Sequence, residues 1–136
     1  MFYDLKAPIL GFESISRVKL EKVDNMFSKI SDPSGDVCIV LVNPYTLREY
    51  SFTIPKYIEL LLELDKDSAV EVYCVVILQK ELENSTVNFL APLIFNVKNR
   101  TAAQIALSIM DYPDFGISDS LKSFIKKEEN DWYLKA

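Results

Sequence analysis

VCIVLV, residues 37–42, is an unbroken apolar run rich in β-branched side chains. A run of this length and composition favours a β-strand that is covered on both faces. It ends at Asn43-Pro44, a turn signal. Residues 70–79 form a second apolar run, and residues 17–23 alternate between apolar and charged side chains up to an expected turn at Asp24-Asn25. The chain is therefore predicted to be mainly β.

A third strand is expected within NFLAPLIFN, residues 88–96. Pro92 has no N–H to give to a ladder, so it marks an edge or a bulge. Asn88 and Asn96 flank the strand, where their side chains can bond turn backbone. Residues 98–101 then form the turn into the next strand, which we expect over 102–110 because apolar and polar side chains alternate there.

One helix is indicated between these strands. Apolar side chains at Ile54, Tyr57, Ile58, Leu61 and Leu62 follow helical spacing, and a proline at position 55 suits the first turn. A second, short helix is predicted to begin at Ser118 or Asp119. The expected fold is a small closed or partly open β-barrel or sandwich, with one central helix and a possible short C-terminal helix.

Length and charge limit the number of domains and the kinds of partner. The 136 residues fit one β domain over 1–117, with 118–136 as a helical tail of the same domain or appended to it. The net charge is −5, and residues 51–84 carry seven acids against three bases. Phosphate binding needs clustered Lys and Arg, so direct nucleic-acid binding is not expected. A basic protein partner suits this charge distribution better.

The same sequence predicts a cytoplasmic protein that is monomeric when free. The N-terminal residues lack the charged lead and apolar run of a signal peptide. The longest apolar run, residues 72–78, is far shorter than the roughly 20 residues that span a bilayer. Cys38 and Cys74 both lie in apolar runs and are expected to be buried thiols rather than a disulfide.

Residues for catalysis are scarce. The chain has no histidine and three glycines, which removes the usual acid–base and metal-ligating side chain and any phosphate-binding glycine loop. We therefore expect no enzyme activity, no metal and no cofactor. Two other classes remain open. A carboxylate hydrolase requires a deep pocket with two acids within about 10 Å, and an oligonucleotide-binding barrel requires a basic, aromatic face.

Three stretches give the chain a resemblance to the flagellar assembly factor FliW family. They are Pro8–Glu13, Val40–Tyr45 with Tyr50, and Thr86–Asn96 with Asn99, Arg100 and Gln104. The third stretch is the most specific. Because only seven residues precede Pro8, the resemblance also implies that one edge strand is missing or shortened. The domain over residues 1–117 is then expected to be FliW-like.

The resemblance implies a function in partner exchange. Proteins of this family bind flagellin and also the translational repressor CsrA, and occupying CsrA relieves repression of flagellin synthesis. The alternative is a non-catalytic β-barrel interaction module of another pathway. The candidate contacts for basic CsrA are Glu59, Glu63, Asp65 and Asp67. The candidate contacts for flagellin are Tyr45, Phe89, Asn99 and Arg100, and Gln104 is expected to be an exposed partner contact as well.

Overall fold

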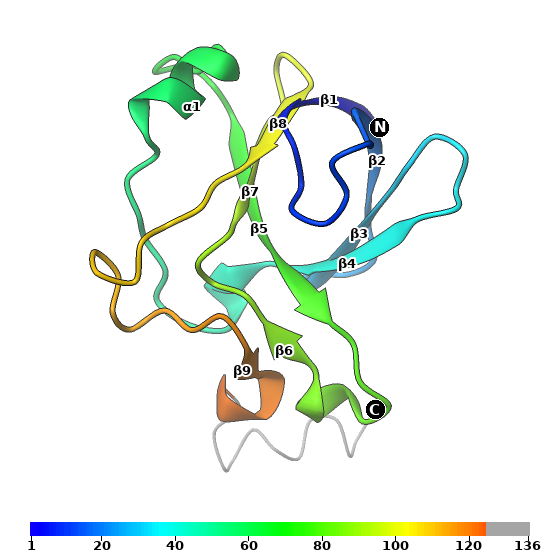
Figure 1. Ribbon diagram of the computed structural model, residues 1–136, viewed down its shortest axis with the longest axis vertical. Coiled ribbons are helices and arrows are strands. Elements are labelled where there is room, and N and C mark those ends of the chain that lie inside the picture. The colour runs from blue at the N-terminus through cyan, green and yellow to red at the C-terminus, as the bar shows by residue number, and fades with distance from the viewer. Residues whose placement is uncertain (125–136) are drawn as a thin grey trace.

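The protein folds into a closed β-barrel with a helix packed against it (Figure 1). The structure, a computed structural model, describes residues 1–124. Its strands are β1 (Phe2–Ala7), β2 (Arg17–Lys22), β3 (Phe27–Ser31), β4 (Cys38–Val42), β5 (Val70–Ile77), β6 (Thr86–Val87), β7 (Leu93–Asn96), β8 (Thr101–Gln104) and β9 (Asp119–Ser120). The helix is α1 (Lys56–Leu61), and 3-10 turns lie at Pro44–Thr46, Leu82–Asn84 and Leu121–Phe124.

Seven of these strands make the barrel in the order β4-β3-β2-β1-β8-β7-β5, and the pairing of β4 with β5 closes it. This closing seam is short, because only Leu41 with Val75 and Val42 with Cys74 are paired. All the pairings are antiparallel except β1 with β8, which run parallel. The expectation of a mainly β barrel is confirmed.

The first strand departs from what the resemblance implied. Residues before Pro8 form β1, which pairs with β2 on one side and β8 on the other. It is an interior strand of the barrel and not a lost edge. Tyr3 on this strand is buried in the barrel core, so the seven residues carry both backbone pairing and packing.

Side chains from β7 explain why the third apolar stretch is continuous. Leu93 and Phe95 point into the barrel core, whereas Ile94 packs on the opposite face beneath α1 with Ile58 and Leu62. Successive side chains of a strand alternate between faces, so a strand covered on both sides has to be apolar throughout. A further cluster surrounds Tyr50, Phe89 and Phe115 outside the barrel, where the chain after β8 returns, and it is extended by β6 and β9.

Pro92 marks an interruption in the ladder along β5. Val76 of β5 faces Val87, and Tyr73 faces Leu93, so two residues of β5 lie opposite residues 88–92. The extra residues leave the ladder, and the backbone oxygen of Pro92 accepts from the Ile105 N–H at 2.9 Å. The predicted irregularity at Pro92 is therefore confirmed.

The helix is shorter than its periodicity predicted. It spans six residues, and only Ile58 of these is fully buried, joined by Leu62 just after the helix. Tyr57 is 56% exposed and Leu61 42% exposed, so the expectation that they share the buried face is wrong. A helix of fewer than two turns lies on the barrel along one narrow line, and only residues four apart reach it.

Two other predictions need correction. The strand predicted over 102–110 ends at Gln104, although the backbone N–H groups of Ile105 and Leu107 still bond Pro92 and Leu90. The C-terminal helix predicted from Ser118 or Asp119 begins instead as β9 and a 3-10 turn. The remainder of that prediction, residues 125–136, lies outside the described residues.

The two cysteines differ in their environment. Both are free thiols, but only Cys74 is buried. Cys38 is exposed because it lies at the outer end of the β3–β4 hairpin, where none of the described strands pairs with the other edge of β4 (Figure 1). Within residues 1–124, none of the helices is long and apolar enough to cross a membrane.

Candidate functional site

The acidic residues predicted to contact a partner lie around the end of α1. Glu59 forms an ion pair with Lys56 at 3.7 Å across one helical turn. Glu63 is exposed just after the helix, where its backbone takes a φ of 55°. Asp65 and Asp67 follow in a turn in which the Asp65 carboxylate accepts from the Asp67 N–H at 2.8 Å. The four acids therefore share one end of the barrel, and three of them are exposed.

A buried amide joins this end of α1 to the β7–β8 turn. Asn96 is fully buried, and its side-chain nitrogen donates to the backbone oxygen of Leu62 at 2.7 Å. Its side-chain oxygen accepts from the backbone N–H groups of Lys98 and Asn99 at 3.1 and 3.3 Å. The predicted role of Asn96 in bonding turn backbone is confirmed. Asn99 and the acidic residues consequently lie at the same end of the molecule.

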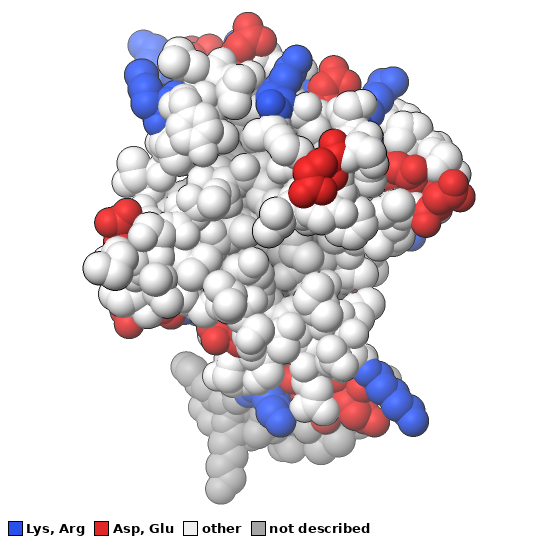
Figure 2. Space-filling model, in the orientation of Figure 1, with Lys and Arg blue, Asp and Glu red and all other residues white. Residues whose placement is uncertain are grey.

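Figure 2 shows what this end presents to solvent. Basic and acidic side chains gather side by side along the upper part of this view, where Figure 1 places α1 and the β7–β8 turn. The middle of the same face carries few charges. A partner that docks at this end therefore has to match the positions of its acidic and basic side chains as well as their net charge.

Arg100 is used inside the molecule. It adopts a φ of 60°, and its guanidinium donates to the Tyr3 hydroxyl at 3.0 Å while lying 5.4 Å from the centre of the Tyr3 ring. The residue is half-buried. The sequence predicted an exposed side chain here, but the Arg100 guanidinium loses part of its contact with solvent because it bonds the Tyr3 hydroxyl and packs on the Tyr3 ring.

Gln104 and Phe89 are also less exposed than predicted. Gln104 is half-buried and bridges two loops, accepting from the Leu10 N–H at 2.7 Å and donating to the Ala91 oxygen at 3.0 Å. Phe89 is fully buried and packs edge-on against Phe124 at 5.3 Å between ring centres. Phe89 has no exposed surface to offer a partner, so we leave it out of the candidate contact surface.

Tyr45, by contrast, is exposed and lines a hollow beside β5. The 3-10 turn that follows Asn43 carries it, and the Asn43 side chain caps that turn by accepting from the Tyr45 N–H at 3.0 Å. The ring also packs edge-on against Tyr50 at 5.8 Å. Burial of part of the ring raises the pKa of the Tyr45 hydroxyl. We call this hollow, lined by Lys22, Asn43, Tyr45 and residues 70–73, the β5 pocket.

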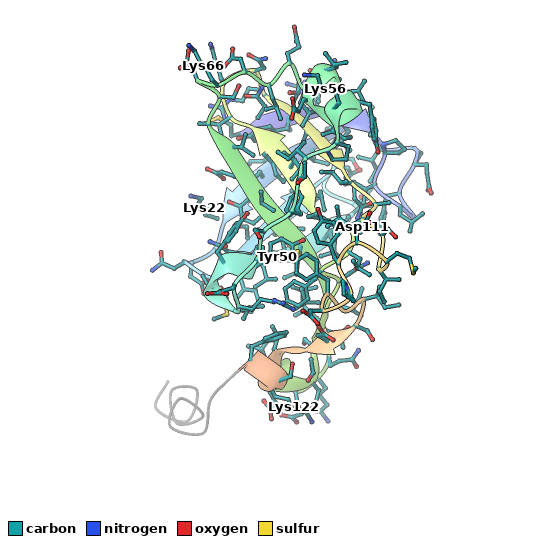
Figure 3. All side chains as sticks on the ribbon, turned by 90° about the vertical axis from the view of Figure 1, so that its left-hand side faces the viewer. Lys22, Tyr50, Lys56, Lys66, Asp111 and Lys122 are labelled. Carbon is teal, nitrogen blue, oxygen red and sulfur yellow. The ribbon has the colours of Figure 1, made fainter. Side chains whose placement is uncertain are left out.

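A second hollow meets the β5 pocket at Val70. It is lined by Ile54, Glu59, Leu64, Asp65, Lys66 and Val70. Val70 lines both hollows, so they lie next to one another along β5, and we refer to the two adjacent hollows together as the groove along β5. Figure 3 faces this side, with Lys66 at the upper end of β5 and Lys22 beside its middle. The groove brings together Tyr45, Glu59 and Asp65 from the predicted set, whereas Asn99 lies outside it.

Most residues of the groove were missed as candidates, and among them are Lys22 and Glu71, which form an ion pair. Lys22 ends β2, and Glu71 is the second residue of β5. Glu71 is the one charged residue in the apolar run 70–79. A charge at such a position could have marked Glu71 as a candidate from the sequence alone. A carboxylate within a strand of the fold needs a hydrogen-bonding or ionic partner nearby. Here the Tyr73 hydroxyl donates to it at 2.7 Å.

The comparisons with known proteins identify the family. The family model described as FliW protein matches residues 1–120. The chain belongs to the FliW family. It is 67% identical over 131 residues to flagellar assembly factor FliW 2 of Helicobacter acinonychis (strain Sheeba), covering 94% of this chain and 97% of that protein. Flagellar assembly factor FliW 1 of Wolinella succinogenes is 55% identical over 130 residues, covering 93% and 100%.

A solved structure supports the same fold. The crystal structure of the flagellar assembly factor FliW matches with a TM-score of 0.80 at 19% identity, covering 93% of this chain and 87% of that chain. A FliW barrel is therefore retained where four residues in five differ. The resemblance seen in three short stretches extends over nearly the whole chain, and with the family comes its general role as a flagellar assembly factor.

Proposed function

We propose that this FliW-family chain works without catalysis, by holding flagellin and the translational repressor CsrA in turn in the cytoplasm. While it holds CsrA, repression of flagellin synthesis is relieved; when flagellin accumulates, flagellin claims the chain and CsrA is released. The observation that supports this most is family membership over residues 1–120. The chemistry of the chain agrees, since partner exchange requires surfaces and no titrating group near neutral pH, and the sequence has no histidine.

Exchange of this kind sets two requirements. The two complexes have to exclude one another or be strongly anticooperative, and both Kd values have to lie near the cellular concentrations of the partners. The Asn96 link brings the acids after α1 and the β7–β8 turn to one end of the barrel. Two partners that each bind part of that end would clash sterically, which favours mutually exclusive binding.

The acidic residues around α1 are the proposed CsrA contacts. CsrA proteins carry basic surfaces, and Glu59, Glu63, Asp65 and Asp67 present carboxylates that attract such a surface. Tyr45 and Asn99 are the exposed members of the proposed flagellin set. An amphipathic helix of flagellin lying in the groove along β5 fits the helix-in-groove mode of recognition.

A competition pulldown tests the exchange. The full chain is immobilised, loaded with purified CsrA, and washed with increasing flagellin. We expect flagellin to displace CsrA in proportion to its own binding. Retention of CsrA on beads that also hold stoichiometric flagellin rules out exchange. Failure to bind either protein favours the alternative, an interaction module of another pathway.

Charge reversal tests the surface. Glu59→Lys with Glu63→Lys is expected to weaken CsrA binding about tenfold or more at low salt, because two attractive charges become repulsive. The matched control reverses Glu81 and Glu83, which lie at the far end of β5 from α1. Equal CsrA affinity for both double variants contradicts docking at α1.

A further inference from the structure

The β5 pocket has the dimensions of a site for one side chain. Its volume is about 220 Å³, and the adjoining hollow has about 290 Å³. Sites for small molecules occupy about 300–1,000 Å³ and enclose most of the ligand. A pocket smaller than that, open to solvent and lined by strand residues, is better matched to a side chain that a protein partner inserts.

The chemistry of the pocket selects a cation. The Glu71 carboxylate lies in its wall, with one oxygen accepting from the Tyr73 hydroxyl at 2.7 Å. The other oxygen lies 3.9 Å from the Lys22 ammonium. The Lys22 side chain is 67% exposed, and an exposed pair at this separation contributes little free energy. Glu71 therefore has an oxygen whose present partner is easily replaced.

Tyr45 supplies the second half of the site. Its side chain is 53% exposed and lines the same pocket. Asn43 fixes the turn that holds it. An aromatic ring and a carboxylate in one pocket suit a guanidinium, which stacks on the ring and bonds the carboxylate through its planar fork. A lysine ammonium can make the ionic contact but not the stacked, two-bond arrangement.

We propose that the β5 pocket takes an arginine side chain from a partner, with its guanidinium on Glu71 and against Tyr45, in place of Lys22. This deepens the proposed function, on which it rests for the identity of the partner: the arginine belongs to CsrA, because Glu59 and Asp65, two of the proposed CsrA contacts, line the adjoining hollow. It adds that the partner has to supply an arginine side chain to the groove.

The adjoining hollow extends the requirement to neighbouring residues of the partner. Val70 is exposed at the junction, so an apolar side chain next to the arginine covers it. Beyond Val70, Glu59 and Asp65 border the second hollow against the single base Lys66. The charged residues that line the two hollows are Glu59, Asp65, Glu71, Lys22 and Lys66, which leaves an excess of one acid over the bases. The matching partner segment carries an arginine, an apolar residue and a second cation.

A peptide titration tests the pocket directly. The full chain, labelled with 15N, is titrated with Ac-Arg-Leu-Arg-NH2 and followed by NMR. We expect shifts to concentrate at Asn43, Tyr45, Val70 and Glu71, with saturation in the millimolar range. The matching peptide with citrulline in place of both arginines has the same shape without charge and is expected to bind at least about tenfold more weakly.

Three variants separate a binding role of Glu71 from a structural one. Glu71→Gln keeps the shape and a hydrogen bond to Tyr73, and is expected to weaken peptide binding about tenfold. Glu81→Gln, an acid outside the groove, is the matched control and leaves binding unchanged. Lys22→Ala removes the competing cation and is expected to tighten binding several-fold. If Lys22 and Glu71 form only a structural bridge, Lys22→Ala does not tighten binding.

The outcomes separate this proposal from the proposed function. Shifts spread over surface acids generally, or equal peptide affinity of Glu71→Gln and wild type, overturn the arginine pocket. So does unchanged affinity of Glu71→Gln for purified CsrA when the wild type binds CsrA, including the case in which only flagellin binding is weakened. We expect the affinity of Glu71→Gln for CsrA to fall about fivefold or more. If the wild type binds neither protein, the proposed function fails, and the peptide titration still decides the pocket.

Discussion

At the scale of single residues, Asn96 shows how one side chain can hold two elements together. Its side-chain amide donates to the Leu62 oxygen and accepts from two N–H groups of the β7–β8 turn, and the Asn96 side chain is fully buried. Asn96→Ala leaves those groups unpaired, so we expect the free energy of unfolding to fall by about 3 kcal/mol. Urea unfolding followed by circular dichroism measures it. Asn99→Ala, at an exposed position, is expected to cost about 0.5 kcal/mol or less.

Glu63 is a second residue that affects stability, in this case through its backbone conformation. A φ of 55° is the left-handed region, which costs a residue with a side chain about 1–2 kcal/mol relative to glycine. Glu63→Gly relieves that cost but makes the unfolded chain more flexible, so the expected net gain in stability is about 0.5–1 kcal/mol. Glu63→Ala removes the same charge and keeps the strain. Equal thermal midpoints for the two variants contradict this explanation.

Cys74 and Cys38 predict contrasting reactivity. Burial raises the pKa of the Cys74 thiol to about 12, so at pH 8 its reactive thiolate is roughly one part in 10⁴. We expect iodoacetamide at pH 8 to label the exposed Cys38 in the native protein and both cysteines in urea, as measured by peptide mass spectrometry. The unfolded Cys74 thiol ionises near pH 9 and the folded one does not, so this group makes stability fall as pH rises above 9. Rapid native labelling of Cys74 contradicts its burial.

At the scale of elements, strands could be predicted from the sequence where the hydrophobic pattern matches the number of strand faces that are buried. The runs at 37–42 and 70–79 are continuous because both faces of β4 and β5 are covered, as at Leu41 inside the barrel and Val42 outside it. The sequence also located Pro92 and the turn at Asp24, whose carboxylate accepts from the N–H groups of Met26 and Phe27. These features are local, so nearby residues suffice to specify them.

What failed depended on distant residues. Helical spacing predicted Tyr57 and Leu61 as buried, but how much of the α1 surface is covered depends on β7 and β8, far along the chain. The exposure of Arg100 was overestimated because its partner, Tyr3, lies 97 residues away in sequence. The groove along β5 was missed for the same reason: β2, the Tyr45 turn, α1 and β5 form it together. All of the predicted partner contacts, including those in the groove, remain predictions.

The short helix α1 provides a test at this scale. Ile58 is fully buried against Ile94 and Ala103, whereas Leu60 is 68% exposed. Ile58→Ala is expected to lower the free energy of unfolding by about 3 kcal/mol through lost burial and the cavity left behind. Leu60→Ala, two positions away, is expected to change it by about 0.5 kcal/mol or less. Chemical denaturation of both variants measures the difference, and similar losses contradict the observed face of the helix.

At the scale of the whole molecule, closure of the barrel depends on its first strand. β1 pairs with β2 and β8, and Tyr3 packs edge-on against Phe95 in the core. Removing residues 1–7 leaves two strand edges and a core cavity, so we expect loss of the cooperative thermal transition. Adding a synthetic peptide of residues 1–9 is expected to restore it by pairing between the two edges. A truncated chain that still melts cooperatively at the same temperature contradicts this dependence.

The parallel pairing of β1 with β8 also has a consequence for synthesis. Asp4 pairs with Thr101, so the first strand made needs a partner about 97 residues further along the chain. At about 5–20 residues per second, the ribosome delivers that partner roughly 5–20 s later. During this interval one edge of β1 has no native neighbour, and contacts between such distant residues form slowly. The nascent chain can hold β1 against β2, which pairs in turn with β3, in the meantime, but it can complete its barrel only when most of its length has emerged.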